Sequence, residues 1–232
     1  MAGSYLSYVL VAALAIALVY AAFTDIRRRE IANHLNLGIA LAAPLWWFAA
    51  GLGWQAIAVQ LGLALLTFAI TCGLFALRQM GGGDVKLLTA LALWFLPGPF
   101  LQMVVLMAVI GGGGSIAMAA CNMQREPGES GRDILAALAA ILWIAGVAAI
   151  IFTIASGKPL ITAMPVSEWS LSPWLVLLFL AAVLALLLTG FRQIMRRQKS
   201  RLRVPYGVAI AASALWMLGQ QAVLQTPLHQ IG

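Results

Sequence analysis

The stretch YLSYVLVAALAIALVYAAF occupies residues 5–23 and contains no charged side chain. It is long enough to cross the hydrocarbon core of a bilayer as a helix, which takes about 20 residues. Asp25 follows it closely, and three arginines come at positions 27–29. No Lys or Arg precedes the stretch. These flanks favour an uncleaved first membrane helix with its N-terminus outside the cytosol over a cleaved secretory signal.

The composition extends this interpretation to the whole chain. The 232 residues are 63% hydrophobic and 9% charged, with a mean hydropathy of +0.98, whereas about a quarter of the residues in soluble domains are charged. We therefore predict one transmembrane domain over residues 1–232, in contact with membrane lipids. The formal net charge of +7 reflects topology rather than nucleic-acid binding, because the basic residues cluster in short loops. Cys72 and Cys121 form no CxxC pair, so neither a metal, a cofactor nor a disulfide is predicted.

Eight apolar segments predict an all-α bundle of six to eight transmembrane helices, with eight preferred. They are Tyr5–Phe23, His34–Ala50, Trp54–Leu77, Val85–Leu96, Phe100–Ala120, Ile134–Ala155, Pro173–Phe191 and Tyr206–Leu224. If all eight cross, the loops of one side hold every basic residue except Lys158. Positive charge stays in the cytosol, so both termini are expected outside and Asp25 and Asp84 at the cytosolic face.

The fourth segment is too short for a full crossing. Its dozen residues span about 18 Å as a helix, against a hydrocarbon core of about 30 Å. Either the bilayer thins locally or Asp84 starts below the cytosolic interface, and we favour the second hypothesis. The glycines at 81–83 support it, because they permit positive φ and close backbone approach in a notch reached by water.

Asp25 and Asp84 are the two acids in constrained settings. A charge at the bilayer centre costs at least about 2.5–3.5 kcal/mol, so an acid near a membrane helix is a functional candidate. Two carboxylates that share one proton can hydrolyse a peptide bond without a metal, and the titration then belongs to the pair. For Asp25 a solvated interfacial charge beside the arginines is an equally good interpretation. The other acids have less constrained settings, with Asp133 as a helix N-cap; they are Glu30, Glu126, Glu129, Asp133 and Glu168.

Several other residues have simpler interpretations. Asn33 is expected to cap the second helix, and Lys86 to be interfacial rather than to stabilise an oxyanion. Gly111–Gly114 favours close helix packing over a substrate groove, and the basic loop Arg192–Arg203 a topology determinant at the anionic leaflet. His34 is expected at the interface, and His229 is given no role.

Three stretches resemble motifs of the type IV prepilin peptidases, membrane aspartic proteases of the GxGD class. They are Asp25–Asn33, Met80–Leu87 and Val204–Ile210, the last similar to the short Flp-type (tight adherence) subgroup. The resemblance implies that Asp25 and Asp84 form a catalytic dyad, supported by the motif residues Gly81, Gly83, Lys86 and Asn33. It also implies a prepilin substrate with an apolar helix and a short basic leader, cut at the cytosolic face of the bacterial inner membrane.

Two departures limit the transfer from the family. Ala32 stands where the family usually has Pro, which affects the start of the second helix. Long bifunctional members carry a cytosolic insertion, often with paired cysteines for zinc, and also methylate the new N-terminus. This chain has no such insertion, so we predict peptidase activity alone.

Two other functions compete with this one. A proton-coupled transporter also uses intramembrane carboxylates, but both acids here are predicted on one side. An inactive scaffold of a pilus assembly system is disfavoured because acids stand at both motif positions.

Overall fold

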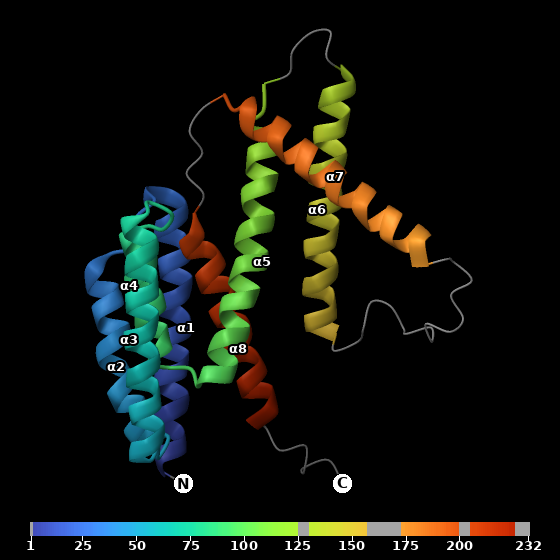
Figure 1. Ribbon diagram of the computed structural model, residues 1–232. Coiled ribbons are helices and arrows are strands. Elements are labelled where there is room, and N and C mark those ends of the chain that lie inside the picture. Colours follow the sequence, from blue (N-terminus) through green and yellow to red (C-terminus); the bar gives the residue numbers. More distant parts are fainter. Residues whose placement is uncertain (1, 125–129, 157–172, 200–204, 226–232) are drawn as a thin grey trace. The chain divides into compact units, whose positions relative to one another are not determined.

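The computed structural model describes residues 2–124, 130–156, 173–199 and 205–225, and nearly all of them are helical (Figure 1). The helices are α1 (Ala2–Arg28), α2 (Asn33–Ala49), α3 (Trp54–Ala76), α4 (Gly82–Ala92), α5 (Pro97–Cys121), α6 (Ser130–Ser156), α7 (Pro173–Arg196) and α8 (Tyr206–Gln225). The described residues contain no strand, only one isolated bridge between Met123 and Gln198. The predicted all-α fold is confirmed. Several residues interpreted above lie outside the described residues: Glu126, Glu129, Lys158, Glu168, Val204 and His229.

The chain divides into two compact units. Unit 1 comprises residues 1–108 and 205–232, and unit 2 comprises residues 109–204, so the division falls within α5. Helix α8 therefore belongs with α1–α4, although all of unit 2 separates them in the sequence. That residues 1–232 act as one peptidase domain stays a prediction.

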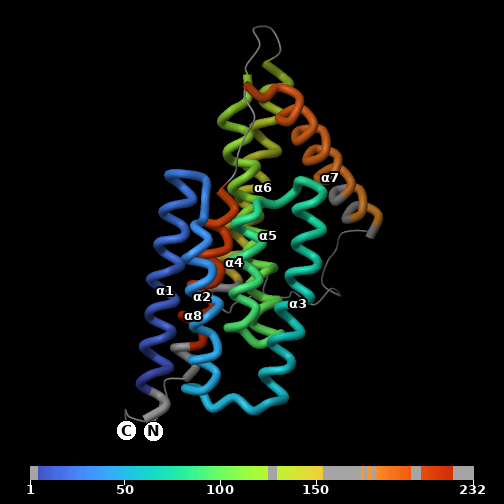
Figure 2. Tube along the Cα trace, turned by 90° about the vertical axis from the view of Figure 1, so that its left-hand side faces the viewer, coloured from blue at the N-terminus to red at the C-terminus, as the bar shows by residue number. Residues whose placement is uncertain are grey.

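In unit 1, helix α4 lies at the centre of a bundle (Figure 2). It contacts α2, α3 and α8, while α1 packs against α2 and α8. Leu87 and Leu91 of α4 are accordingly fully buried. Lipid tails are as apolar as leucine, so close packing rather than exclusion from water holds such a core together.

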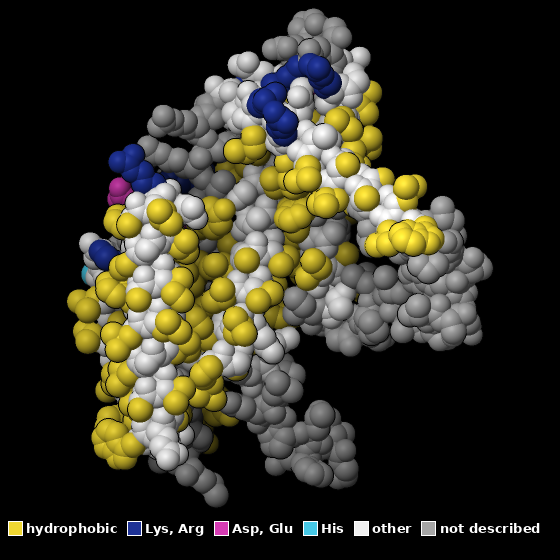
Figure 3. Space-filling model, in the orientation of Figure 1, with side chains coloured by type: hydrophobic (Ala, Val, Ile, Leu, Met, Phe, Trp, Pro, Cys, Tyr) yellow, Lys and Arg dark blue, Asp and Glu magenta, His cyan; other side chains and the backbone are white. Residues whose placement is uncertain are grey.

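Large apolar side chains cover the outer faces of the helices (Figure 3). On α1 alone, Val9, Ile16 and Val19 are each more than half exposed. A continuous apolar surface of this kind suits hydrocarbon and not water. The charged side chains visible on unit 1 gather toward one end of its helices in Figure 3. The protein is therefore a multi-pass membrane protein.

Four helices of the described residues are long and apolar enough to cross a membrane: Tyr5–Arg28, Trp54–Ala76, Pro97–Cys121 and Ser130–Thr153. Helix α2 has 17 residues and α4 only 11. Helix α4 thus rises only about 16 Å at 1.5 Å per residue, less than a hydrocarbon core. Six to eight spans, with both termini outside, stay a prediction.

The glycines before Asp84 form a regular start of a helix. Gly81 is the N-cap of α4 with φ −76° and ψ 147°, and α4 begins at Gly82 rather than at the predicted Val85. Among the described glycines only Gly51 has a positive φ, so residues 81–83 do not adopt the positive φ that glycine permits. Because these glycines have no side chain, Asp84 and Ile31 can lie close to the backbone at the start of α4 instead.

Two tryptophans fix the other end of α4, which stops at Ala92 rather than at the predicted Leu96. The Nε1–H of Trp47 donates to the carbonyl of Leu93 at 2.8 Å. The Nε1–H of Trp94 donates to the carbonyl of Ile39 at 2.9 Å, and its ring lies 5.7 Å from that of Trp46. These contacts tie the end of α4 to α2.

Unit 2 contains α6, α7 and the second half of α5, and glycines allow its helices to approach closely. A Cβ built on Gly113 would lie 2.9 Å from Cγ1 of Val147 on α6. At Gly190 of α7 an added Cβ would meet Cβ of Ala139. Close packing is the interpretation we favoured for Gly111–Gly114, and Gly113 has this role.

Asp133 is not a helix N-cap. Helix α6 begins at Ser130, so Asp133 lies inside its first turn. Its Oδ1 accepts a hydrogen bond from Arg197 at 3.1 Å. The predicted start at Ile134 came too late because Gly131 and Arg132 interrupt the apolar pattern, although both are helical.

Candidate active site

Asp25 lies inside α1 rather than after it. The helix continues past the predicted end at Phe23 to Arg28. Arg29 then adopts a left-handed φ of 56°, and its N–H donates to the carbonyl of Asp25 at 3.0 Å. Asp25 is only 6% exposed. The alternative interpretation of Asp25 as a solvated interfacial charge is therefore wrong.

Asp84 occupies the third position of α4, where a carboxylate can reach back to the N-cap. Its side chain interacts with the backbone N–H of Gly81. A Cβ on Gly81 would lie 3.0 Å from Oδ2 of Asp84, so glycine makes room for this arrangement. The unpaired N–H groups of a helix start favour negative charge there.

The two acids face one cavity of about 340 Å³. Its walls come from the end of α1, the start of α2 and the start of α4: Asp25, Arg29, Glu30, Ile31, Asn33, Gly81, Gly82, Gly83 and Asp84. The charge pattern predicts only that both acids lie on one side of the membrane. The fold adds that the ends of segments one and four are neighbours.

Ile31 holds these ends together. It is buried, and a Cβ on Gly83 would lie 3.3 Å from its Cβ. The buried Asn36 of α2 also donates from Nδ2 to the carbonyl of Gly83 at 3.3 Å. The start of α4 therefore packs directly on the segment that follows Asp25.

Burial and the neighbouring charge of Asp25 raise the pKa of Asp84 from 3.8 to about 6. The N–H of Gly81 acts in the opposite direction, because it stabilises the ionised form. Two like charges at close range resist simultaneous ionisation. The pair can therefore hold one proton up to a pH of about 6, above the ordinary pKa of aspartic acid.

This raised pKa predicts how stability depends on pH. The folded protein binds the Asp84 proton more tightly than the unfolded chain, so the stability it contributes is present below pH 3.8 and is lost as the pH rises through about 6. Asp84→Asn removes this loss. In detergent, the melting temperature of the variant should match that of the wild type near pH 4 and exceed it above pH 6. A difference that is constant from pH 4 to 8 would contradict the prediction.

Asn33 and Lys86 meet each other at the edge of the site. The N-cap of α2 is Ala32, without a side-chain cap, so the expectation that Asn33 caps this helix is wrong. Instead, Oδ1 of Asn33 accepts a hydrogen bond from Nζ of Lys86 at 2.7 Å, in an exposed position. Lys86 does not line the cavity. This geometry agrees with an interfacial Lys86 that links α4 to α2.

The pattern-based interpretation missed Ile31 and the start of α8. Gly207 of α8 lies against both Asp25 and Ile31. The stretch 204–210 was noted for its resemblance alone, and no chemical side chain in it indicates a role. The one indication in the sequence is Gly207 itself, which follows Pro205-Tyr206 at the start of a helix. A glycine there permits another residue to approach the backbone closely.

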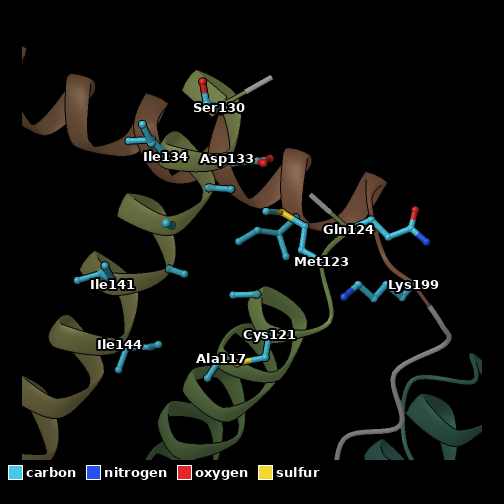
Figure 4. A pocket seen from close by; sticks show the side chains of 15 residues that line it. Ala117, Cys121, Met123, Gln124, Ser130, Asp133, Ile134, Ile141, Ile144 and Lys199 are labelled. Atoms are coloured by element: carbon cyan, nitrogen blue, oxygen red, sulfur yellow. The ribbon is translucent and has the colours of Figure 1, made fainter. Parts of the chain in front are cut away.

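A larger cavity of about 1180 Å³ lies in unit 2 and has different walls. Figure 4 shows three isoleucines of α6 along one side and Gln124 and Lys199 on the opposite side, the labelled residues being Ala117, Cys121, Met123, Gln124, Ser130, Asp133, Ile134, Ile141, Ile144 and Lys199. Among the described residues that line it, Asp133 is the one acid, and it is paired with Arg197. These described walls therefore contain no second carboxylate for acid–base chemistry. Within the described residues, no three His, Cys, Asp or Glu side chains are grouped to hold a metal ion.

Comparison with known families gives a match to the type IV leader peptidase family over residues 12–116. This region contains both acids, the walls of the small cavity and most of α5. Neither the curated proteins nor the solved structures give a match.

Proposed function

Since residues 12–116 match the type IV leader peptidase family, we propose that the protein is a membrane-embedded aspartic endopeptidase. Its substrate is a prepilin of the Flp type, from which it removes the short basic leader. The observation that carries the proposal is the shared cavity of Asp25 and Asp84.

The two carboxylates divide the work of hydrolysis. The ionised one accepts a proton from water, whose oxygen attacks the carbonyl carbon of the scissile peptide bond. The protonated one donates its proton to the carbonyl oxygen, and in the second step a proton passes to the leaving amine as the C–N bond breaks. The raised pKa of Asp84 supports this division, because one acid stays protonated while its neighbour ionises.

The site is proposed to face the cytosol from the bacterial inner membrane. Arg27 and Arg28 end α1 beside Asp25, and Arg29 lines the cavity. Basic residues at a helix end are retained in the cytosol. A prepilin helix then lies among the membrane helices while its leader stays in water, and the junction unwinds at the cavity to expose its carbonyls.

The position of both acids at one end of unit 1 disfavours a proton relay. A transporter that moves protons by alternating access needs groups reachable from both sides of the membrane. Asp25 and Asp84 instead share one cavity. A peptidase needs its site to be accessible from only one side of the membrane.

The decisive test is cleavage by the purified protein in proteoliposomes. A synthetic Flp-type prepilin that carries its leader is added, and the products are identified by mass spectrometry. We expect one cut at the leader junction, and none in liposomes without the protein. An intact prepilin together with proton-driven solute uptake would favour the transporter; an intact prepilin without uptake would favour the scaffold.

A further inference from the structure

We propose that Gly207, in the first turn of α8, is a positioning residue that fixes the carboxylate of Asp25 within the dyad. The inference rests on the proposed function, because it concerns the geometry of the same two acids. Gly207 stands in the stretch 204–210 noted above for its resemblance to the family, but it lies outside the matched residues 12–116, and neither the resemblance nor the match assigns it a role.

Space, not backbone conformation, requires glycine at this position. Gly207 is buried, and its φ is not in the left-handed region. A Cβ built on it would lie 2.8 Å from Oδ2 of Asp25 and 3.0 Å from its Cγ. Real Cβ atoms essentially never come closer than 3.0 Å to other heavy atoms. Any larger residue at 207 must therefore displace the Asp25 and Ile31 side chains or move α8.

The start of α8 also acts on Asp25 electrostatically. The backbone N–H groups of Val208 and Gly207 interact with its carboxylate, as expected for an anion at a helix N-terminus. The buried Oδ2 itself has no hydrogen-bond partner in the protein. The two N–H groups thus stabilise the ionised form of Asp25, and its Oδ2 is available to accept a proton.

Ile31 links the position of Gly207 to that of Asp84. A Cβ on Gly207 would lie 2.8 Å from Cδ1 of Ile31, while the missing Cβ of Gly83 lets α4 approach the other side of the same residue. The starts of α4 and α8 therefore both pack against Ile31. Helix α4 contains Asp84, and the start of α8 packs against Asp25. The separation of the two carboxylates depends on both glycines.

The test compares three variants in the prepilin cleavage assay. Gly207→Ala adds one methyl group at the contact with Asp25. Gly219→Ala is the matched control, because a Cβ on this glycine of the same helix meets nothing within 4 Å. Gly207→Ala combined with Ile31→Val removes the contact with Cδ1 of Ile31 but keeps the contact with Asp25.

We expect kcat of Gly207→Ala to fall by about 100-fold, the effect of a small displacement of a reacting group, with KM for the prepilin unchanged. The pH profile of kcat should shift as well, because the coupling of two acids depends on their separation. A smaller folded fraction would instead lower the rate equally at every pH. Gly219→Ala should keep the wild-type values, and the double variant should keep the low kcat.

Three outcomes would overturn the inference. The first is wild-type kcat in Gly207→Ala, and the second is recovery of kcat in the double variant, which would assign the effect to packing on Ile31. The third is loss of the folded state in both Gly207 variants, measured by thermal melting, which would make the role structural alone. Failure of the wild-type protein to cleave would instead reject the proposed peptidase function, so the two failures are distinguishable.

Discussion

Asp25→Asn and Asp84→Asn are each expected to lower prepilin cleavage on the order of 1000-fold, the upper range for loss of a general acid or base. Asparagine has nearly the same size, but it neither accepts a proton from water nor releases one. Each acid lines the cavity, so either change leaves one carboxylate with no partner for proton exchange. The measurement is the initial rate of leader removal in proteoliposomes, at matched amounts of folded protein.

Asp133→Asn provides the control for these two changes. Asp133 is paired with Arg197 at 3.1 Å in unit 2 and does not line the smaller cavity. Its replacement removes a carboxylate and an ion pair, yet at matched amounts of folded protein it should leave the cleavage rate within about two-fold of the wild type, because sites that share no partners act independently. If either Asp25→Asn or Asp84→Asn still cleaves at the wild-type rate, the dyad is not the catalyst.

Trp94→Ala is expected to lower the free energy of unfolding by about 3–5 kcal/mol, the usual cost of truncating a large buried aromatic side chain. Trp94 is 3% exposed, its ring packs beside that of Trp46 in a tilted orientation, and its Nε1–H donates to the carbonyl of Ile39. Helix α4 has only 11 residues, too few to be stable alone. It therefore depends on these contacts to stay in the bundle.

Trp54→Ala is the matched control, since Trp54 begins α3 and is 82% exposed. Denaturation in mixed micelles, followed by circular dichroism, should show a small change for Trp54→Ala and a large one for Trp94→Ala. Cleavage should fall with the folded fraction of the Trp94 variant, because α4 carries Asp84. Equal stability of the two variants would contradict the role of Trp94 as an anchor of α4.

The helices could be predicted from the sequence because polar residues, Gly or Pro separate each apolar segment from the next. Their ends could not be predicted equally well. Helix α1 extends past its apolar segment to include the polar Asp25, which packs against α8. Helix α4 begins with Gly82 and Gly83, although glycine is a poor helix former. In each case a tertiary contact outweighs the local propensity.

The candidate site shows the same limit. Hydropathy and charge single out Asp25 and Asp84, since acids are rare in this chain and costly in a membrane. They contain no information on which helix ends meet. The contact between Gly83 and Ile31 and that between Gly207 and Asp25 depend on the absence of a side chain, and a glycine in the sequence does not indicate which residue will lie against it.

The membership of α8 in unit 1 has a consequence for biosynthesis. Asp25 and Asp84 are translated early, but the helix that packs on Asp25 emerges only after the whole of unit 2. The nascent chain therefore has both acids in the membrane before their surroundings are complete. If the protein cleaves leaders as proposed above, its site is complete only after α8 has been inserted, so the order of translation places leader cleavage after the assembly of unit 1.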